Sequence, residues 1–107
     1  MRTTLPDRRP CEIETVLDSA GNRLDVCVGF DAAGRVREIF ADGYKVGSDA
    51  RAELSDALVM ASVALQSGLD IDALRRHVGR EAIHPGAPAA STLGLALDTA
   101  ARMEGLG

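Results

Sequence analysis

Apolar and polar residues alternate in the first part of the chain, as they do in strands that bury one face. The alternation is clearest over residues 23–30, where every second residue is apolar. Residues 11–18 alternate less regularly, and residues 36–41 form a third apolar segment. Glycine-containing turns separate the three segments at residues 19–22 and 31–34, and such turns favour hairpins. The pattern therefore predicts a three-stranded antiparallel meander.

The faces of the first two strands decide where the two cysteines lie. One face of the first strand carries Cys11, Ile13, Thr15 and Leu17. If residues 17 and 24 lie opposite each other across the turn, Cys11 is on the apolar face of the sheet and Cys27 on the other face. Side chains on opposite faces cannot form a disulfide. We therefore expect two separate reduced thiols.

From residue 49 onward, the apolar residues follow a helical spacing. Residues 49–67 carry one apolar face, formed by Leu54, Ala57, Leu58, Ala61 and Leu65. Val59, Met60 and Val63 add apolar groups on other faces, so we expect this helix to be covered on more than one side. One face can pack on the sheet, and another needs the later helices or a second subunit.

Two further helices follow. Asp70 is placed to cap a short helix over residues 71–78 that ends at Gly79, and Ser91 to cap a last helix over residues 92–104. Because strands come first and helices after, the sequence predicts an α+β fold of two layers, a meander packed on about three C-terminal helices. Residues 1–10 are expected to form a flexible lead-in, and residues 11–107 a single domain. The predicted core contains Leu24, Val26, Val28, Phe30, Leu58, Ala61 and Leu65.

The composition narrows the function classes. The net charge is −4, and the aromatic residues are one tyrosine and two phenylalanines. Both facts argue against nonspecific nucleic-acid binding, which depends on neutralising phosphates and on stacking with bases. No apolar run approaches the roughly 20 residues that span a bilayer, and no signal peptide precedes the first strand, so we expect a soluble, cytoplasmic protein. The cysteines and histidines lack CxxC or HxxxH spacing, which predicts no metal site.

One loop-to-helix junction is suited to an anionic ligand. Gly43 and Gly47 flank it, Lys45 lies between them, and Ser48 and Asp49 begin the next helix. Free N–H groups at a helix N-terminus favour anions, and glycines let a phosphate approach the backbone. Asp49, however, places a carboxylate where the phosphate would lie, and the spacing matches no phosphate motif. The same residues also suit a tight turn into a capped helix, so both interpretations stay open.

The densest basic cluster contains Arg75, Arg76, His77 and Arg80. As a functional feature, it would contact a phosphate or an acidic partner, with Arg75 and Arg76 as neighbours of the junction at residues 43–49. As a structural feature, it is a solvated helix end whose cations complement the helix dipole. No Ser/His/Asp or Cys/His set can be assembled, so we predict no catalytic residue.

Three segments carry a family resemblance: Arg9-Pro10, KVGSD at residues 45–49 and ALQSGLD at residues 64–70. They resemble the opening Arg-Pro, the K-x-G-S-D junction and the helix ending in A-L-x-x-G of the TSCPD domain. This family occurs as the C-terminal appendage of cobalamin-dependent (class II) ribonucleotide reductases and as small stand-alone proteins. The similarity covers roughly residues 9–80.

The resemblance implies an accessory role in ribonucleotide reduction and deoxyribonucleotide supply, without activity of this chain alone. The reductase members carry their radical-forming cysteine and cobalamin site in a separate barrel, so cobalamin is implied only by association and we expect no bound cofactor. The expected ligand is a nucleotide, a nucleic acid or a protein partner such as a reductase catalytic chain.

Two alternatives stay open. The chain would be a purely structural interaction module, a homodimer that uses the apolar faces of helices 49–67 and 92–104. Otherwise it would be a fragment that acts as a ribonucleoside-diphosphate reductase only together with a separate catalytic chain.

Overall fold

The structure is a computed structural model that describes residues 11–44, 47–84 and 87–106, so the predicted lead-in at residues 1–10 lies outside the described residues. An antiparallel sheet contains β1 (Cys11–Leu17), β2 (Arg23–Phe30) and β3 (Val36–Asp42), in that spatial order. The helices that follow are α1 (Asp49–Gln66), α2 (Ile71–Arg75) and α3 (Thr92–Leu106). The predicted α+β meander with three C-terminal helices is confirmed.

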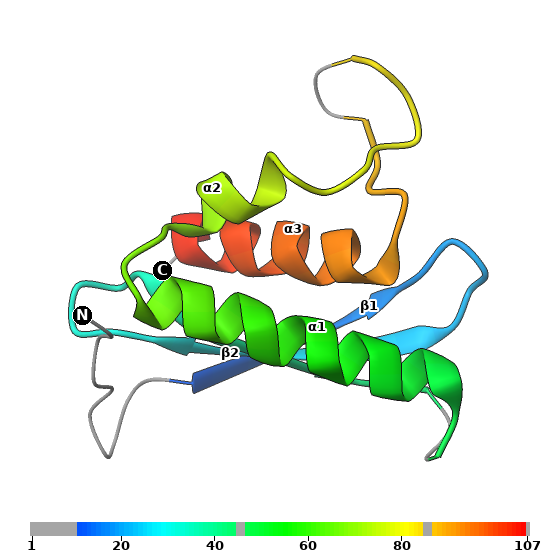
Figure 1. The fold of residues 1–107 in the computed structure, drawn as a ribbon, viewed down its shortest axis with the longest axis horizontal. Coiled ribbons are helices and arrows are strands. Elements are labelled where there is room, and N and C mark those ends of the chain that lie inside the picture. The colour runs from blue at the N-terminus through cyan, green and yellow to red at the C-terminus, as the bar shows by residue number, and fades with distance from the viewer. Residues whose placement is uncertain (1–10, 45–46, 85–86, 107) are drawn as a thin grey trace.

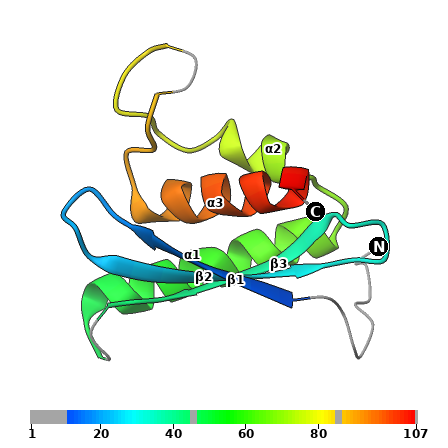
Figure 2. The ribbon, with the colours of Figure 1, turned by 180° about the vertical axis from the view of Figure 1, so that it is seen from behind.

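The helices lie on one face of the sheet (Figure 1). α1 and α3 contact the strands, and α2 packs on α3, further from the sheet. In the reverse view the strands lie in front of α1, and their near face carries no helix (Figure 2). The part of the chain that the structure describes contains no helix of the length and apolar character needed to cross a bilayer.

The core fills the space between the sheet and α1 and α3. Six of the predicted core residues are buried there: Leu24, Val26, Val28, Phe30, Leu58 and Leu65. Ala61, the seventh, is only partly buried at the margin of the core. The α3 contribution is Ala96, Leu97, Ala100 and Met103. The alternation of β2 and the helical spacing of α1 therefore identified most of the core correctly.

The start of each helix is fixed by a side chain that the sequence predicted. Ser48, Asp70 and Ser91 each accept a hydrogen bond from the backbone N–H three residues later, at 3.2, 2.8 and 3.0 Å. Each bond satisfies an N–H group that has no partner inside its helix. The predicted caps are confirmed.

The register of β1 differs by one residue from the predicted pairing. Leu17 lies opposite Arg23, not Leu24. The reason is the turn, in which Asp18 accepts hydrogen bonds from the N–H groups of Ala20 and Asn22 at 2.9 and 2.8 Å. The glycine of this turn, at residue 21, adopts a φ of +84°, which residues with a side chain rarely tolerate. The hairpin closes one residue earlier than the apolar pattern indicated.

A shift of one residue turns every side chain of a strand to the other face. Ile13 and Leu17 consequently point away from the helices, and they are 69% and 66% exposed. The prediction that Cys11 and Cys27 lie on opposite faces is wrong for the same reason. Both cysteines lie on the outer, helix-free face of the sheet, in neighbouring strands.

Candidate functional site

The arginine cluster lies at the end of α2. The helix is shorter than predicted, because it ends at Arg75 with Arg76 as its C-cap, and not at Gly79. The chain then runs along α3, where Arg80 forms a bridge with Ala89 before α3 begins. This path brings the end of α2, the segment after it and one face of α3 around a pocket of about 720 Å³.

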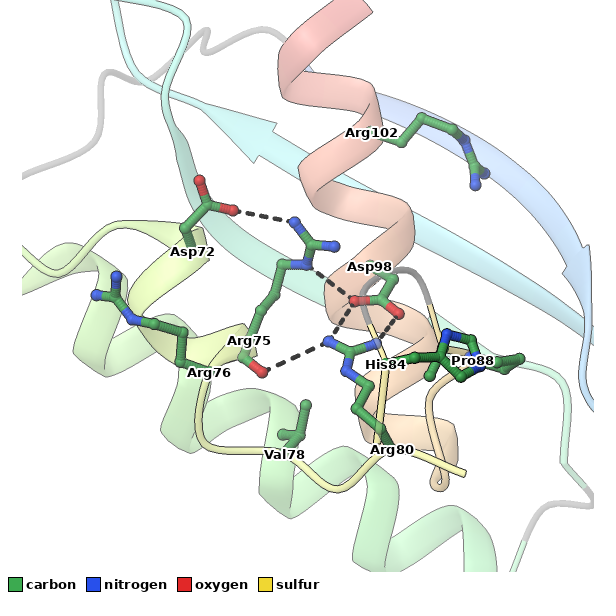
Figure 3. Close-up of a pocket in the computed structure, with 10 residues that line it drawn as sticks. Asp72, Arg75, Arg76, Val78, Arg80, His84, Pro88, Asp98 and Arg102 are labelled. Carbon is green, nitrogen blue, oxygen red and sulfur yellow. Dashed lines mark hydrogen bonds and ion pairs between the residues drawn. The ribbon is translucent and has the colours of Figure 1, made fainter. Parts of the chain in front are cut away.

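Asp98 is at the centre of this pocket (Figure 3). Its Oδ1 accepts hydrogen bonds from Nε of Arg75 and from Nη2 of Arg80, both at 2.9 Å. Its Oδ2 accepts a further bond from Nη1 of Arg80. Arg75 also donates from Nη1 to Asp72 at 3.0 Å. A single carboxylate of α3 therefore holds two guanidinium groups side by side and ties α2 to α3.

These contacts shift the protonation equilibria of all three groups. Burial raises the pKa of the Asp98 carboxyl, but the hydrogen bonds from Arg80 and Arg75 outweigh that effect, and the pKa lies below its ordinary value. The hydrogen bond to Asp98 likewise raises the pKa of each guanidinium. All three groups are therefore charged at neutral pH.

Positive charge exceeds negative charge in the pocket lining. Four arginines (75, 76, 80 and 102) line it, against Asp72 and Asp98. Arg102 forms an ion pair with Glu14 of β1. The backbone N–H of Arg76 donates to the Asp72 carbonyl oxygen at the end of α2. Its guanidinium makes no hydrogen bond or ion pair with any residue in the described ranges, and it points away from Asp98 (Figure 3). The pocket thus has two fixed guanidinium groups on its wall and one exposed guanidinium group at its margin.

The predicted junction at residues 43–49 lies elsewhere, at the N-terminal end of α1. Gly43 sits against β2, where a Cβ atom would come within 2.2 Å of the Arg23 carbonyl oxygen. Gly47 adopts a φ of +81°, and Ser48 caps the helix. Lys45 lies outside the described residues. The contact with β2 therefore explains Gly43, and the local turn and helix cap explain Gly47 and Ser48, while a ligand role for the junction stays a prediction.

The junction has little excess positive charge among its described residues. A shallow depression of about 290 Å³ is lined by Asp49 and Arg51 together with small residues. Arg51 also lies 3.5 Å from Asp42. The described part of the junction therefore offers an anion backbone donors but no unpaired cation.

The structure does not bring the junction and the arginine cluster together. The junction is at the N-terminal end of α1, whereas Arg75 and Arg76 are at the end of α2, which lies near the C-terminal part of α1 (Figure 1). An α-helix of 18 residues is about 27 Å long. The candidate site residues thus fall into two separate groups, one with Gly43, Gly47, Ser48 and Asp49 and one with Arg75 and Arg76.

Sequence reasoning missed Asp98 and Arg102, although the sequence held a signal for both. They are the charged residues of an otherwise uncharged stretch, residues 92–103 of α3, and lie four positions apart. Residues at this spacing share a helix face. That pattern marks a polar stripe beside the core-facing stripe. Its partners on α2 follow only from the packing of the two helices.

The described residues include no group of three or more His, Cys, Asp or Glu side chains arranged to hold a metal ion. Comparison of the chain with protein-family models, with curated proteins and with solved structures gives no match.

Proposed function

We propose that the chain is a non-catalytic accessory domain that binds the phosphate groups of a nucleotide in the pocket between α2 and α3. The observation that carries this proposal is the Asp98 cluster, in which one carboxylate holds two guanidinium groups side by side in the pocket lining. Guanidinium groups are planar donors that match phosphate oxygens in pairs. Holding them in place before binding lowers the entropy cost of ordering a ligand-contacting side chain.

The size and charge of the pocket support a ligand of this class. A volume of about 720 Å³ falls within the range of roughly 300–1,000 Å³ that is typical of small-molecule sites. The lining carries two more arginines than aspartates, although the chain as a whole has a net charge of −4. A local excess of positive charge on an acidic protein favours a small anion over a long polyanion, which the remaining surface repels.

Binding of ADP, measured by isothermal titration calorimetry at low salt, tests the proposal. Arg76→Ala should weaken binding by roughly 10–100-fold, because a hydrogen bond to a charged group contributes about 1.5–3 kcal/mol. The thermal midpoint should not change, since the Arg76 guanidinium has no partner among the described residues and the variant keeps the backbone N–H that caps α2. The matched control is Arg23→Ala, which removes an exposed arginine of the outer sheet face and should leave ADP affinity unchanged.

Two results would contradict the proposal. One is the absence of saturable ADP binding up to millimolar concentration. The other is an equal loss of affinity in Arg76→Ala and Arg23→Ala, which would indicate general charge attraction without a site. Added salt should weaken specific binding only in part, because partly buried pairs are screened less than exposed ones.

The proposed link to ribonucleotide reduction rests on the resemblance of residues 9–80 to the TSCPD domain. We expect no reduction of ribonucleotides by the purified chain, with or without cobalamin. A pull-down from cells, probed for a reductase catalytic chain, tests the association. If the wild type recovers that chain and a charge-reversed Arg76→Glu variant does not, the association depends on the pocket.

A second candidate function is that of an interaction module, favoured by the outward face of α1. Val59, Met60 and Val63 are exposed on this helix, so the described helices do not cover it on every side. The apolar face of α3, in contrast, is buried in the core through Ala96, Leu97 and Ala100. A homodimer would therefore use α1 and not both helices.

A further inference from the structure

The outer face of the sheet brings the two cysteines of the chain into contact. Cys11 lies opposite Gly29, and Cys27 lies opposite Ile13. The cysteines are therefore diagonal neighbours on one face of an antiparallel pair of strands. Their Sγ atoms are 3.1 Å apart. The β1–β2 ladder, which pairs every residue of β1, holds both backbones in this arrangement.

The surroundings leave room for a bond between the two sulfurs. Gly29 has no side chain, so the position directly across from Cys11 holds no group that would compete for its space. The Cys11 side chain leans along the diagonal toward Cys27, as their contact shows. A disulfide has an S–S length of about 2.05 Å. The sulfurs, which are 3.1 Å apart, must therefore approach by about 1 Å to form the bond.

Both thiols are accessible to reagents. Cys11 is exposed and Cys27 is partly exposed, and the face that carries them has no helix over it (Figure 2). Oxidation there does not require any opening of the core, which lies on the other side of the sheet. Surface thiols in contact differ in this respect from buried cysteines, which are inert.

We propose that Cys11 and Cys27 form a reversible intramolecular disulfide, with a low-molecular-weight disulfide such as oxidised glutathione as the oxidant. The thiolate of Cys11, the more exposed of the two, attacks one sulfur of the oxidant and releases one glutathione thiolate. The thiolate of Cys27 then attacks Sγ of Cys11, forms the Cys11–Cys27 bond and releases the second glutathione thiolate. Two protein thiols and one oxidised glutathione thus give one protein disulfide and two reduced glutathione molecules.

The bond would act on the least anchored strand. β1 is an edge strand whose side chains are mostly exposed, and only Val16 packs against the core. A link between residues 11 and 27 closes the first hairpin covalently and restricts the unfolded chain. The oxidised form should therefore resist heat better, and β1 should fray less from β2.

The test is equilibration of the wild-type chain in glutathione buffers from fully reduced to fully oxidised, followed by alkylation and mass spectrometry. We expect the monomer to lose two hydrogens and to become inert to the alkylating reagent. The thermal midpoint should rise by roughly 10 °C relative to the reduced form. Cys27→Ser should stop at the first step and keep one glutathione on Cys11.

A matched control moves one thiol to the other face of the same strand. The double variant Cys11→Ser, Glu12→Cys keeps two thiols one residue nearer in sequence, but residue 12 is exposed on the helix side of β1. It should not form the intramolecular bond. Two thiols that remain open to alkylation in the most oxidising buffer would overturn the proposal, and so would a product linked only between chains.

Discussion

Ser62 of α1 satisfies both backbone groups of Ile39 in β3. Its Oγ accepts a hydrogen bond from the Ile39 N–H at 3.0 Å and donates to the Ile39 carbonyl oxygen at 3.2 Å. β3 is an edge strand, and its outward backbone groups have no neighbouring strand to pair with. Ser62 is 5% exposed. A polar residue therefore lies in the buried face of α1 because the sheet edge beneath the helix needs a hydrogen-bond partner.

Replacement of Ser62 by alanine should destabilise the fold by about 1–3 kcal/mol. The substitution leaves one donor and one acceptor of Ile39 buried without a partner, and the cost is that of desolvating them. Urea denaturation measures the change. Ser55→Ala, at an exposed position of the same helix, is the control and should stay within about 0.5 kcal/mol of wild type. Equal stability of the two variants would mean that α1 does not protect this edge.

Replacement of Leu58 by alanine should cost about 2–5 kcal/mol, because Leu58 is fully buried and its loss leaves a cavity. The same urea titration measures it, with Ile83→Ala as the control. Ile83 is fully exposed, so its truncation should change little. An unchanged midpoint for Leu58→Ala would contradict the assignment of the core-facing side of α1.

The parts of the fold that follow from local pattern were predictable. Apolar residues alternate along β2, where the buried ones are Leu24, Val26, Val28 and Phe30, and they recur at helical spacing along α1. The core-facing sides of both elements therefore follow from the sequence alone. The face of β1 does not, because it depends on where the first turn closes. The apolar pattern favoured burial of Ile13 and Leu17, but the hydrogen bonds of Asp18 set the register against it. Turn geometry prevailed over the weak alternation of an edge strand.

The candidate site was only partly predictable for a related reason. Arg75, Arg76 and Arg80 are close in sequence, and the cluster was recognised from that alone. Asp98, which organises two of them, is 18 residues beyond the nearer one. Its position depends on how α2 packs on α3, and no local pattern specifies that packing. The caps at Ser48 and Asp70 are local and were predicted correctly.

The Asp98 cluster should make stability depend on pH in the acid range. The folded-state pKa of Asp98 is lowered, so the ionised carboxylate stabilises the folded state. This contribution to the free energy of unfolding is fully present above the unfolded pKa of about 3.9. That contribution is lost as pH falls through the lower folded value. Asp98→Asn should therefore be less stable than wild type at pH 7, and the gap should narrow as pH falls below about 4.

Urea titrations at several pH values between neutral and strongly acidic measure this gap. Asp56→Asn, at an exposed position of α1, is the control and should follow the wild-type profile. A constant difference between Asp98→Asn and wild type at all pH values would show that the amide disturbs packing and that the charge is not responsible.

Replacement of Ser48 by alanine separates the two interpretations of the junction. The hydroxyl accepts a hydrogen bond from the Arg51 N–H at 3.2 Å, so its loss should cost about 0.5–2 kcal/mol of stability. If the serine is a cap only, ADP affinity should not change. Calorimetry of Lys45→Ala provides the comparison with Ser48→Ala. This variant should also leave ADP affinity unchanged if the ligand binds between α2 and α3. A loss of ADP affinity in both Ser48→Ala and Lys45→Ala would mean that the ligand binds at the junction.

The exposed face of α1 should hold the chain in a homodimer. Val59, Met60 and Val63 are 48%, 70% and 39% exposed, and three large apolar side chains close together on one helix are typical of an interface. We expect a dimer mass by light scattering at micromolar concentrations, since twofold pairing is the commonest assembly. Met60→Glu should give a monomer without loss of fold, because the new charge would be buried unpaired at the interface.

The outer sheet face provides the matched control for this prediction. Phe40 is 45% exposed there, so Phe40→Glu places the same charge on the other apolar surface. If α1 forms the interface, Phe40→Glu remains a dimer and Met60→Glu does not. The reverse result would place the interface on the sheet, and a monomeric wild type would show that neither surface drives self-association.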